Sequence, residues 1–194
     1  MAKPKLDKKE LLKNSLSVFK SKGYTATSMT DLATASGLLK GSIYHYIESK
    51  EQLMLEVLES LMDHYVNKVF VTAYDEELSP YDRLFLLSKR AEDIYIYEDA
   101  GNFFANIGLE TKNLDLGFSE IIMDFFEKWI STVEYLYSYV LDEEEAHAKA
   151  ESVVAEIEGA VMLMKVMDDA GRLRRVLASI LEEYKELEKV NSVN

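Results

Sequence analysis

Residues 28–53, with the sequence SMTDLATASGLLKGSIYHYIESKEQL, decide the fold of this chain. The first four residues, S-M-T-D, are spaced as a capping box, which marks the start of a short helix that ends near Gly37. A second short helix is expected over about residues 39–46, and another capping box at Ser49 opens a much longer helix. Two short helices joined by a tight, glycine-containing turn indicate a helix-turn-helix.

The second helix of such a motif can enter the major groove of DNA. We expect Leu32 and Ala33 to pack against Ile43, so that the opposite side of this helix faces outward. Gly41 would let the backbone approach DNA closely, and Lys50 stands in the first turn of the next helix, where free N–H groups suit a phosphate. The outward side chains that can bind phosphates or base edges are Lys40, Ser42, Tyr44 and His45.

Charge is distributed unevenly along the chain. The net charge of the 194 residues is −13, yet residues 1–50 hold nine lysines and four acidic residues, which leaves −18 for the remainder. This asymmetry indicates a basic module that meets a polyanion, joined to an acidic body that repels it. A lysine-rich end that arose by chance is the alternative that charge alone leaves open.

Composition excludes several classes of protein. With 48% hydrophobic residues, only 8 glycines and 2 prolines, the chain can bury a sizeable core in long helices. The absence of cysteine excludes disulfide frameworks and thiol chemistry, and the three histidines lack metal-ligand spacing, so we expect no metal and no other cofactor. No pair of carboxylates is distinguished by its neighbours, so we expect no catalytic residues. Without an apolar run of eighteen residues or an apolar signal core, the sequence predicts a soluble, cytoplasmic protein with no membrane partner.

Apolar residues recur with helical spacing almost everywhere, and no segment alternates as a strand would. We therefore expect an all-α fold of about nine helices. Residues 1–50 would form a three-helix DNA-binding domain with a helix-turn-helix, and residues 51–194 a helical ligand-binding and dimerisation domain. The apolar faces of the last two helices are too broad for one side of a small bundle. They are expected to form a homodimer interface through Val153, Ile157, Gly159, Ala160, Val176 and Ile180.

Aromatic residues crowd into residues 95–140. Most would belong to the core, but adjacent aromatic pairs cannot all face one core from a single helix, so some are expected to line a ligand pocket. Only two basic residues lie in this stretch, so a small apolar or aromatic ligand, neutral or cationic, is favoured over an anion. Glu110 or Asp124 could pair with a cation. The expected ligand-binding residues are Phe103, Phe104, Phe125, Phe126 and Trp129.

The sequence over about residues 8–55 resembles the N-terminal signature of the tetracycline-repressor (TetR) family. The matching residues are Gly23-Tyr24, Thr27, Met29, Asp31-Leu-Ala33, Gly37-Leu38, Lys40-Gly-Ser-Ile-Tyr44, His45-Tyr46, Ser49-Lys50-Glu51 and Leu53. An Ile157-Glu-Gly-Ala160 stretch is similar to one in the penultimate helix of many members. The resemblance implies a homodimeric repressor that leaves its operator when a small molecule fills the C-terminal domain. It also implies DNA contacts at Thr27, Lys40, Gly41, Ser42, Tyr44, His45 and Lys50.

Two residues depart from the family's pattern. Leu39 stands where a serine or threonine usually begins the recognition helix, so we expect a capping or phosphate contact to be missing there. Ile47 replaces the usual phenylalanine, and this substitution should preserve burial.

The leading hypothesis is a dimeric transcriptional repressor that binds a near-palindromic double-stranded DNA operator and is released by a mostly apolar small molecule. One alternative is an all-α enzyme, or a small-molecule or lipid-binding protein, that uses the aromatic pocket and does not bind DNA. Another is an oligomeric scaffold whose basic end touches membranes. The enzyme would need polar catalytic residues among the aromatics, and the scaffold a wide apolar face beside the lysines. Neither pattern is present.

Overall fold

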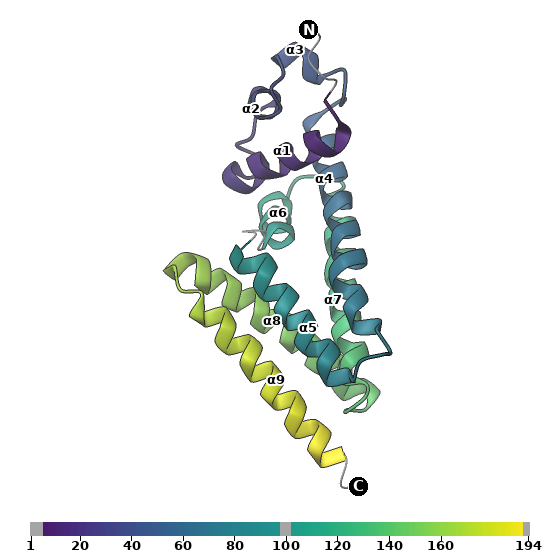
Figure 1. Cartoon of the computed structure of the whole chain (residues 1–194). Helices are drawn as coiled ribbons and strands as arrows, with labels where there is room; N and C mark the ends of the chain where they lie inside the picture. Colours follow the sequence, from purple (N-terminus) through teal and green to yellow (C-terminus); the bar gives the residue numbers. More distant parts are fainter. Residues whose placement is uncertain (1–5, 98–101, 192–194) are drawn as a thin grey trace. The chain divides into compact units, whose positions relative to one another are not determined.

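The structure is a computed structural model that describes residues 6–97 and 102–191 (Figure 1). Within these ranges all regular structure is helical, as predicted. Two π-helical turns, η1 (Tyr65–Val69) and η3 (Asp93–Tyr97), and a 3-10 turn, η2 (Phe70–Tyr74), accompany the α-helices. None of the helices in this part of the chain is long and apolar enough to cross a membrane. The α-helices are α1 (Lys8–Lys22), α2 (Met29–Ala35), α3 (Lys40–Ile43), α4 (Lys50–His64), α5 (Pro80–Glu92), α6 (Phe103–Thr111), α7 (Phe118–Tyr137), α8 (Glu143–Met167) and α9 (Gly171–Asn191).

The chain forms two compact units. The first extends to Asp63 and also includes Phe103–Met123, so it contains α1 to α4, α6 and the start of α7. The second comprises His64–Asn102 and the chain from Asp124 onward. The unit that holds the helix-turn-helix is therefore larger than the segment of residues 1–50 that we assigned to it, because a later stretch of chain returns to it.

The second unit is built around the paired helices α8 and α9, which lie side by side (Figure 1). As expected from the acidic run after Val140, a helix starts there: Asp142 is the N-cap of α8, and its side chain accepts a hydrogen bond from the backbone N–H of Glu145 (2.9 Å). Three glutamates follow in its first turn, where carboxylates suit the positive end of the helix dipole. The helix ends at Met167, and the next residue, Asp168, adopts the left-handed conformation (φ +50°).

Two buried tyrosines in the core of this unit differ in how their hydroxyls are satisfied. The rings of Tyr137 and Tyr184 meet edge to face, 5.2 Å apart. The Tyr184 hydroxyl donates a hydrogen bond to the carbonyl of Leu136 (2.8 Å), whereas the Tyr137 hydroxyl is buried without a partner. Burial raises the pKa of both phenols, so both stay neutral.

This difference predicts different effects of two matched substitutions on stability. Tyr184→Phe should lower the free energy of unfolding by about 1 kcal/mol, because the Leu136 carbonyl loses its donor. Tyr137→Phe should leave stability unchanged or raise it, because it removes a polar atom that nothing satisfies. Urea unfolding followed by circular dichroism measures both, and an equal loss in the two variants would contradict this assignment of the hydrogen bonds.

Candidate nucleic-acid interface and ligand cavity

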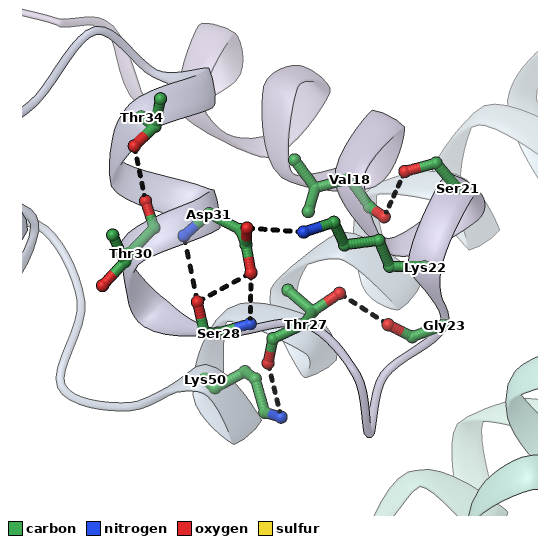
Figure 2. Close-up of polar contacts among 10 residues, drawn as sticks. All are labelled: Val18, Ser21, Lys22, Gly23, Thr27, Ser28, Thr30, Asp31, Thr34 and Lys50. Atoms are coloured by element: carbon green, nitrogen blue, oxygen red, sulfur yellow. Dashed lines mark hydrogen bonds and ion pairs between the residues drawn. The ribbon is translucent and has the colours of Figure 1, made fainter.

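The capping box predicted at Ser28 is present and fixes the start of α2. The Ser28 hydroxyl accepts from the N–H of Asp31 (3.2 Å), and the Asp31 carboxylate accepts from the N–H of Ser28 (2.9 Å; Figure 2). The same carboxylate pairs with Lys22 at the end of α1 (2.5 Å). Hydrogen bonds from Lys22 and Ser28 hold the pKa of Asp31 well below its usual range. One side chain therefore caps α2 and ties it to α1.

The turn between α2 and α3 depends on Gly37, whose φ of +67° lies in the left-handed region that favours glycine. The N–H of Leu38 donates to the carbonyl of Ala33 (2.8 Å), which closes the end of α2. Leu32, Ala33 and Ile43 are all buried, as predicted. This packing leaves the opposite side of α3 exposed.

Five predicted DNA-binding residues lie on this side, which we call the recognition face: Lys40, Gly41, Ser42, Tyr44 and His45. Four of them are exposed and Ser42 is half-buried. Lys40 makes no ion pair with any described residue, so its charge is available to an external anion. Leu39, before the first residue of α3, is exposed and makes no side-chain cap, and Ile47 is buried, as expected at both positions.

Thr27 and Lys50 are placed differently from the recognition face. The Thr27 side chain is 2% exposed, and its hydroxyl donates to the carbonyl of Gly23 (2.6 Å). The Lys50 ammonium donates to the carbonyls of Tyr24 (2.9 Å) and Thr27 (2.8 Å), and lies 4.3 Å from the centre of the Tyr24 ring (Figure 2 includes the Thr27 bond). Through these contacts both side chains are bonded to the backbone of the loop between α1 and α2. We therefore assign them to positioning that loop rather than to touching DNA.

Glu110 of α6 also holds this loop. Its carboxylate accepts from the N–H groups of Tyr24 (2.9 Å) and Thr25 (2.6 Å). Partial burial raises the pKa of Glu110, but the hydrogen bonds from Thr25 and Tyr24 and the charge of Lys50 outweigh burial and lower it overall. A side chain at Gly23 (φ +76°) would place its Cβ 2.7 Å from this carboxylate, so glycine is required there. Glu110 is thus not the partner of a cationic ligand that the sequence suggested.

The second unit contains a small cavity of about 30 Å³. Both π-helical turns contribute to its wall, and single-turn π-helices often occur at functional sites. The lining is almost entirely apolar. It consists of Tyr65, Val69, Phe70, Leu84, Leu87, Ser88, Ala91, Ile94, Tyr95, Trp129, Val133, Val153, Ile157 and Ile180.

Of the five predicted ligand-binding residues, only Trp129 lines this cavity. Phe125 and Phe126 contact the Trp129 ring, with centroids 6.0 and 6.4 Å away, but are not part of the wall. Phe103 and Phe104 are buried in the first unit. Helical spacing located the aromatic clusters but could not tell which side chains of separate helices converge. Asp124, the other suggested cation partner, is paired with Lys128 (2.6 Å).

The predicted dimer residues also need correction. Four of them are buried within their own chain: Val153, Ile157, Ala160 and Ile180. All of these except Ala160 also line the cavity. Gly159 and Val176 are half-buried. The error arises because α8 is apolar on two sides, and periodicity alone does not show which side faces the chain's own core. The exposed side, which we call the outer face of α8, carries Ala155, Gly159, Met162 and Val166.

Two parts of the chain match known protein families. Residues 11–57 match the family model described as bacterial regulatory proteins, tetR family. Residues 91–179 match the model of the C-terminal domain of LmrA/YxaF-like transcriptional regulators. The chain belongs to the TetR family. Its helix-turn-helix is therefore the TetR signature, and α5 to α9 supply most of the second matched region.

Relatives of this TetR-family chain include two repressors called KstR2. The one from Mycolicibacterium smegmatis is 30% identical over 124 residues, which cover 58% of this chain and 60% of the relative. The one from Rhodococcus jostii is 29% identical over 64% of this chain and 62% of the relative. The chain thus spans less than two thirds of either relative. A TetR regulator from Legionella pneumophila has the same fold, with a TM-score of 0.82 at 19% identity over 94% of this chain and 99% of the other.

The Glu110 contact predicts that the stability of the first unit, which holds the helix-turn-helix, depends on pH. Glu110→Ala should lower the free energy of unfolding near neutral pH by about 1 kcal/mol, a value reduced for partial exposure to solvent. Because the pKa of Glu110 is lowered on folding, this stabilisation is present above the ordinary carboxyl pKa and is lost as the pH falls through the folded value. Thermal unfolding of wild type and variant at neutral and acidic pH measures the difference.

The matched control is Glu120→Ala, which removes an exposed carboxylate from the first turn of α7 in the same unit. This variant should unfold like the wild type, apart from a small helix-dipole effect. A Glu110 variant that behaves like the control would mean that the carboxylate does not hold the loop.

Proposed function

We propose that this protein is a homodimeric, DNA-binding transcriptional repressor that a small, mostly apolar molecule releases from a near-palindromic operator. Such a regulator acts in the cytoplasm, where bacterial DNA lies. The observation that carries the proposal is the recognition face. It presents an unpaired lysine, a tyrosine hydroxyl and a histidine on the exposed side of a helix whose other side is buried. These groups suit phosphates and base edges.

The charge distribution supports contact with DNA through this unit. Lysines predominate in the first fifty residues, whereas the rest of the chain is strongly acidic. A polyanion is therefore attracted to the recognition face and repelled by the acidic body. The printed names of the KstR2 relatives, transcriptional repressors of the helix-turn-helix type, agree with this proposal.

Dimerisation is proposed through the outer face of α8. Met162 and Val166 are 54% and 77% exposed on this face, beside the small residues Ala155 and Gly159. No atom lies within 4 Å of a Cβ built at Gly159, so a neighbouring helix has room to approach closely. A second copy of the chain would bury this apolar strip and supply the second recognition helix that a near-palindromic operator needs.

The cavity supports a regulatory ligand better than it supports a carrier or an enzyme. Its volume of about 30 Å³ holds about two water molecules, too little for a stored lipid. An apolar occupant must therefore displace lining side chains as it enters. Such a ligand releases DNA only if it binds more tightly to the dimer whose recognition faces are wrongly spaced for the operator.

DNA binding is tested on duplexes selected from a randomised pool. Lys40→Ala and Tyr44→Ala should each weaken binding about 5- to 150-fold, because single contacts of this kind contribute about 1–3 kcal/mol. Loss of the Lys40 contact should also reduce the slope of log affinity against log salt by about one unit. Lys112→Ala, which removes an exposed lysine elsewhere in the same unit, is the control and should bind normally. Normal affinity in both recognition-face variants would refute the assignment.

The dimer face is tested by sedimentation. Met162→Asp should convert the dimer to monomers, because it places a charge in the apolar strip. Gly159→Leu should also weaken the dimer while sparing the monomer fold, since the space around Gly159 is open within the chain. Leu109→Asp makes the same kind of change at an exposed side chain of α6 and should leave the dimer intact. A wild-type chain that sediments as a monomer at micromolar concentration would exclude this interface.

A further inference from the structure

An acidic residue lies beside the apolar cavity and has no cationic partner. Glu158 of α8 is partly buried, and its carboxyl interacts with the side chain of Tyr95 on η3. Tyr95 is itself buried and lines the cavity, as does Ile157, the residue before Glu158. Among the described residues, no lysine, arginine or histidine forms an ion pair with Glu158. The cavity therefore has an acidic group just behind one of its walls.

A second acceptor lies close to the same residue. The side-chain N–H of Asn102 donates to the backbone carbonyl of Glu158 (3.3 Å), but its side-chain oxygen is buried without a hydrogen-bond partner. A buried acceptor without a donor is unfavourable, by about 1–3 kcal/mol in general. Among the described residues Glu158 thus has no cationic partner, and a buried acceptor without a donor belongs to a residue that contacts its backbone.

We propose that Glu158 is the counter-ion of the regulatory ligand and that this ligand is a slender apolar amine. Its ammonium group would donate to the Glu158 carboxylate and to the free oxygen of Asn102, in place of the Tyr95 hydroxyl. Its alkyl or aryl body would enter the cavity beside Trp129. The small volume favours a narrow chain, because a broad ring system would displace more of the wall. The inference rests on the proposed function only in taking this cavity as the ligand site.

The ionisation of Glu158 gives this site a characteristic pH dependence. Burial raises the pKa of Glu158 to about 7, although the hydrogen bond from Tyr95 acts in the opposite direction. The titratable group that acts on Glu158 is Tyr95, which in turn is influenced by Tyr65 of η1; burial raises the pKa of Tyr95, so that phenol stays neutral. A primary alkylamine remains protonated up to about pH 10. The affinity for an amine should therefore rise about tenfold between about pH 6 and pH 8, as the carboxylate forms.

Binding can be measured without DNA, because Trp129 is the single tryptophan of the chain and lines the cavity. We would titrate the full-length protein with hexylamine, hexanol and hexanoate, which share one alkyl chain, and follow tryptophan fluorescence with calorimetry as a second readout. At about pH 8 hexylamine should bind at least tenfold more tightly than hexanol, and hexanoate more weakly than either. Glu158→Gln should remove the preference for the amine and its pH dependence while keeping the affinity for hexanol.

Glu151→Gln is the matched control, since it removes an exposed carboxylate from the same helix and should behave like the wild type. The proposal is overturned if hexanol or hexanoate binds as tightly as hexylamine, if Glu158→Gln retains the preference, or if neither readout detects hexylamine at millimolar concentration. The pH profile of the wild type tests the same point without any substitution, should Glu158→Gln fail to fold. Release of DNA is measured separately: hexylamine that binds as predicted but leaves DNA bound supports the site and contradicts only the regulatory role.

Discussion

The placement of the recognition face depends on one loop, between α1 and α2, which two opposite charges hold from distant parts of the chain. The Glu110 carboxylate accepts hydrogen bonds from two backbone N–H groups at the start of the loop. The Lys50 ammonium donates to the carbonyls of Tyr24 and Thr27. Backbone groups of a short loop need such partners when helices pack over them. Because the loop sets where α2 begins, and α2 leads through Gly37 into α3, both charges act on the orientation of the side chains of the recognition face.

Helix α8 links the other two proposed activities. Its inner side contributes Val153 and Ile157 to the cavity wall, and its outer face carries the proposed dimer contact. Glu158 follows Ile157 and precedes Gly159 in sequence, and its carboxyl interacts with Tyr95 of a π-helical turn. An occupant of the cavity would therefore contact the same helix that carries the proposed dimer contact. Packed interfaces shift between discrete arrangements, so a small displacement of this helix would be enough to couple the two proposed activities.

Local patterns in the sequence predicted the helix-turn-helix well. The capping box at Ser28, the turn at Gly37 and the burial of Ile43 depend on residues within one short segment, where spacing determines structure. Contacts between distant segments could not be predicted in this way. Glu110 is 85 residues from Thr25, and no local pattern marks it as a loop anchor. The two apolar sides of α8 were likewise indistinguishable until packing showed which one the chain buries itself.

The open surroundings of Gly159 have an evolutionary consequence. A Cβ built at Gly159 would meet no other atom within 4 Å, and Met162 and Val166 are exposed, so these residues can change with little effect on the core that the inner side supports. Bacteria that carry many related regulators must keep each one from pairing with the others. If this face forms the proposed dimer, its sequence can change after gene duplication without affecting folding. A few substitutions that complement one another across the twofold axis would keep two identical copies paired and would prevent pairing with the related protein.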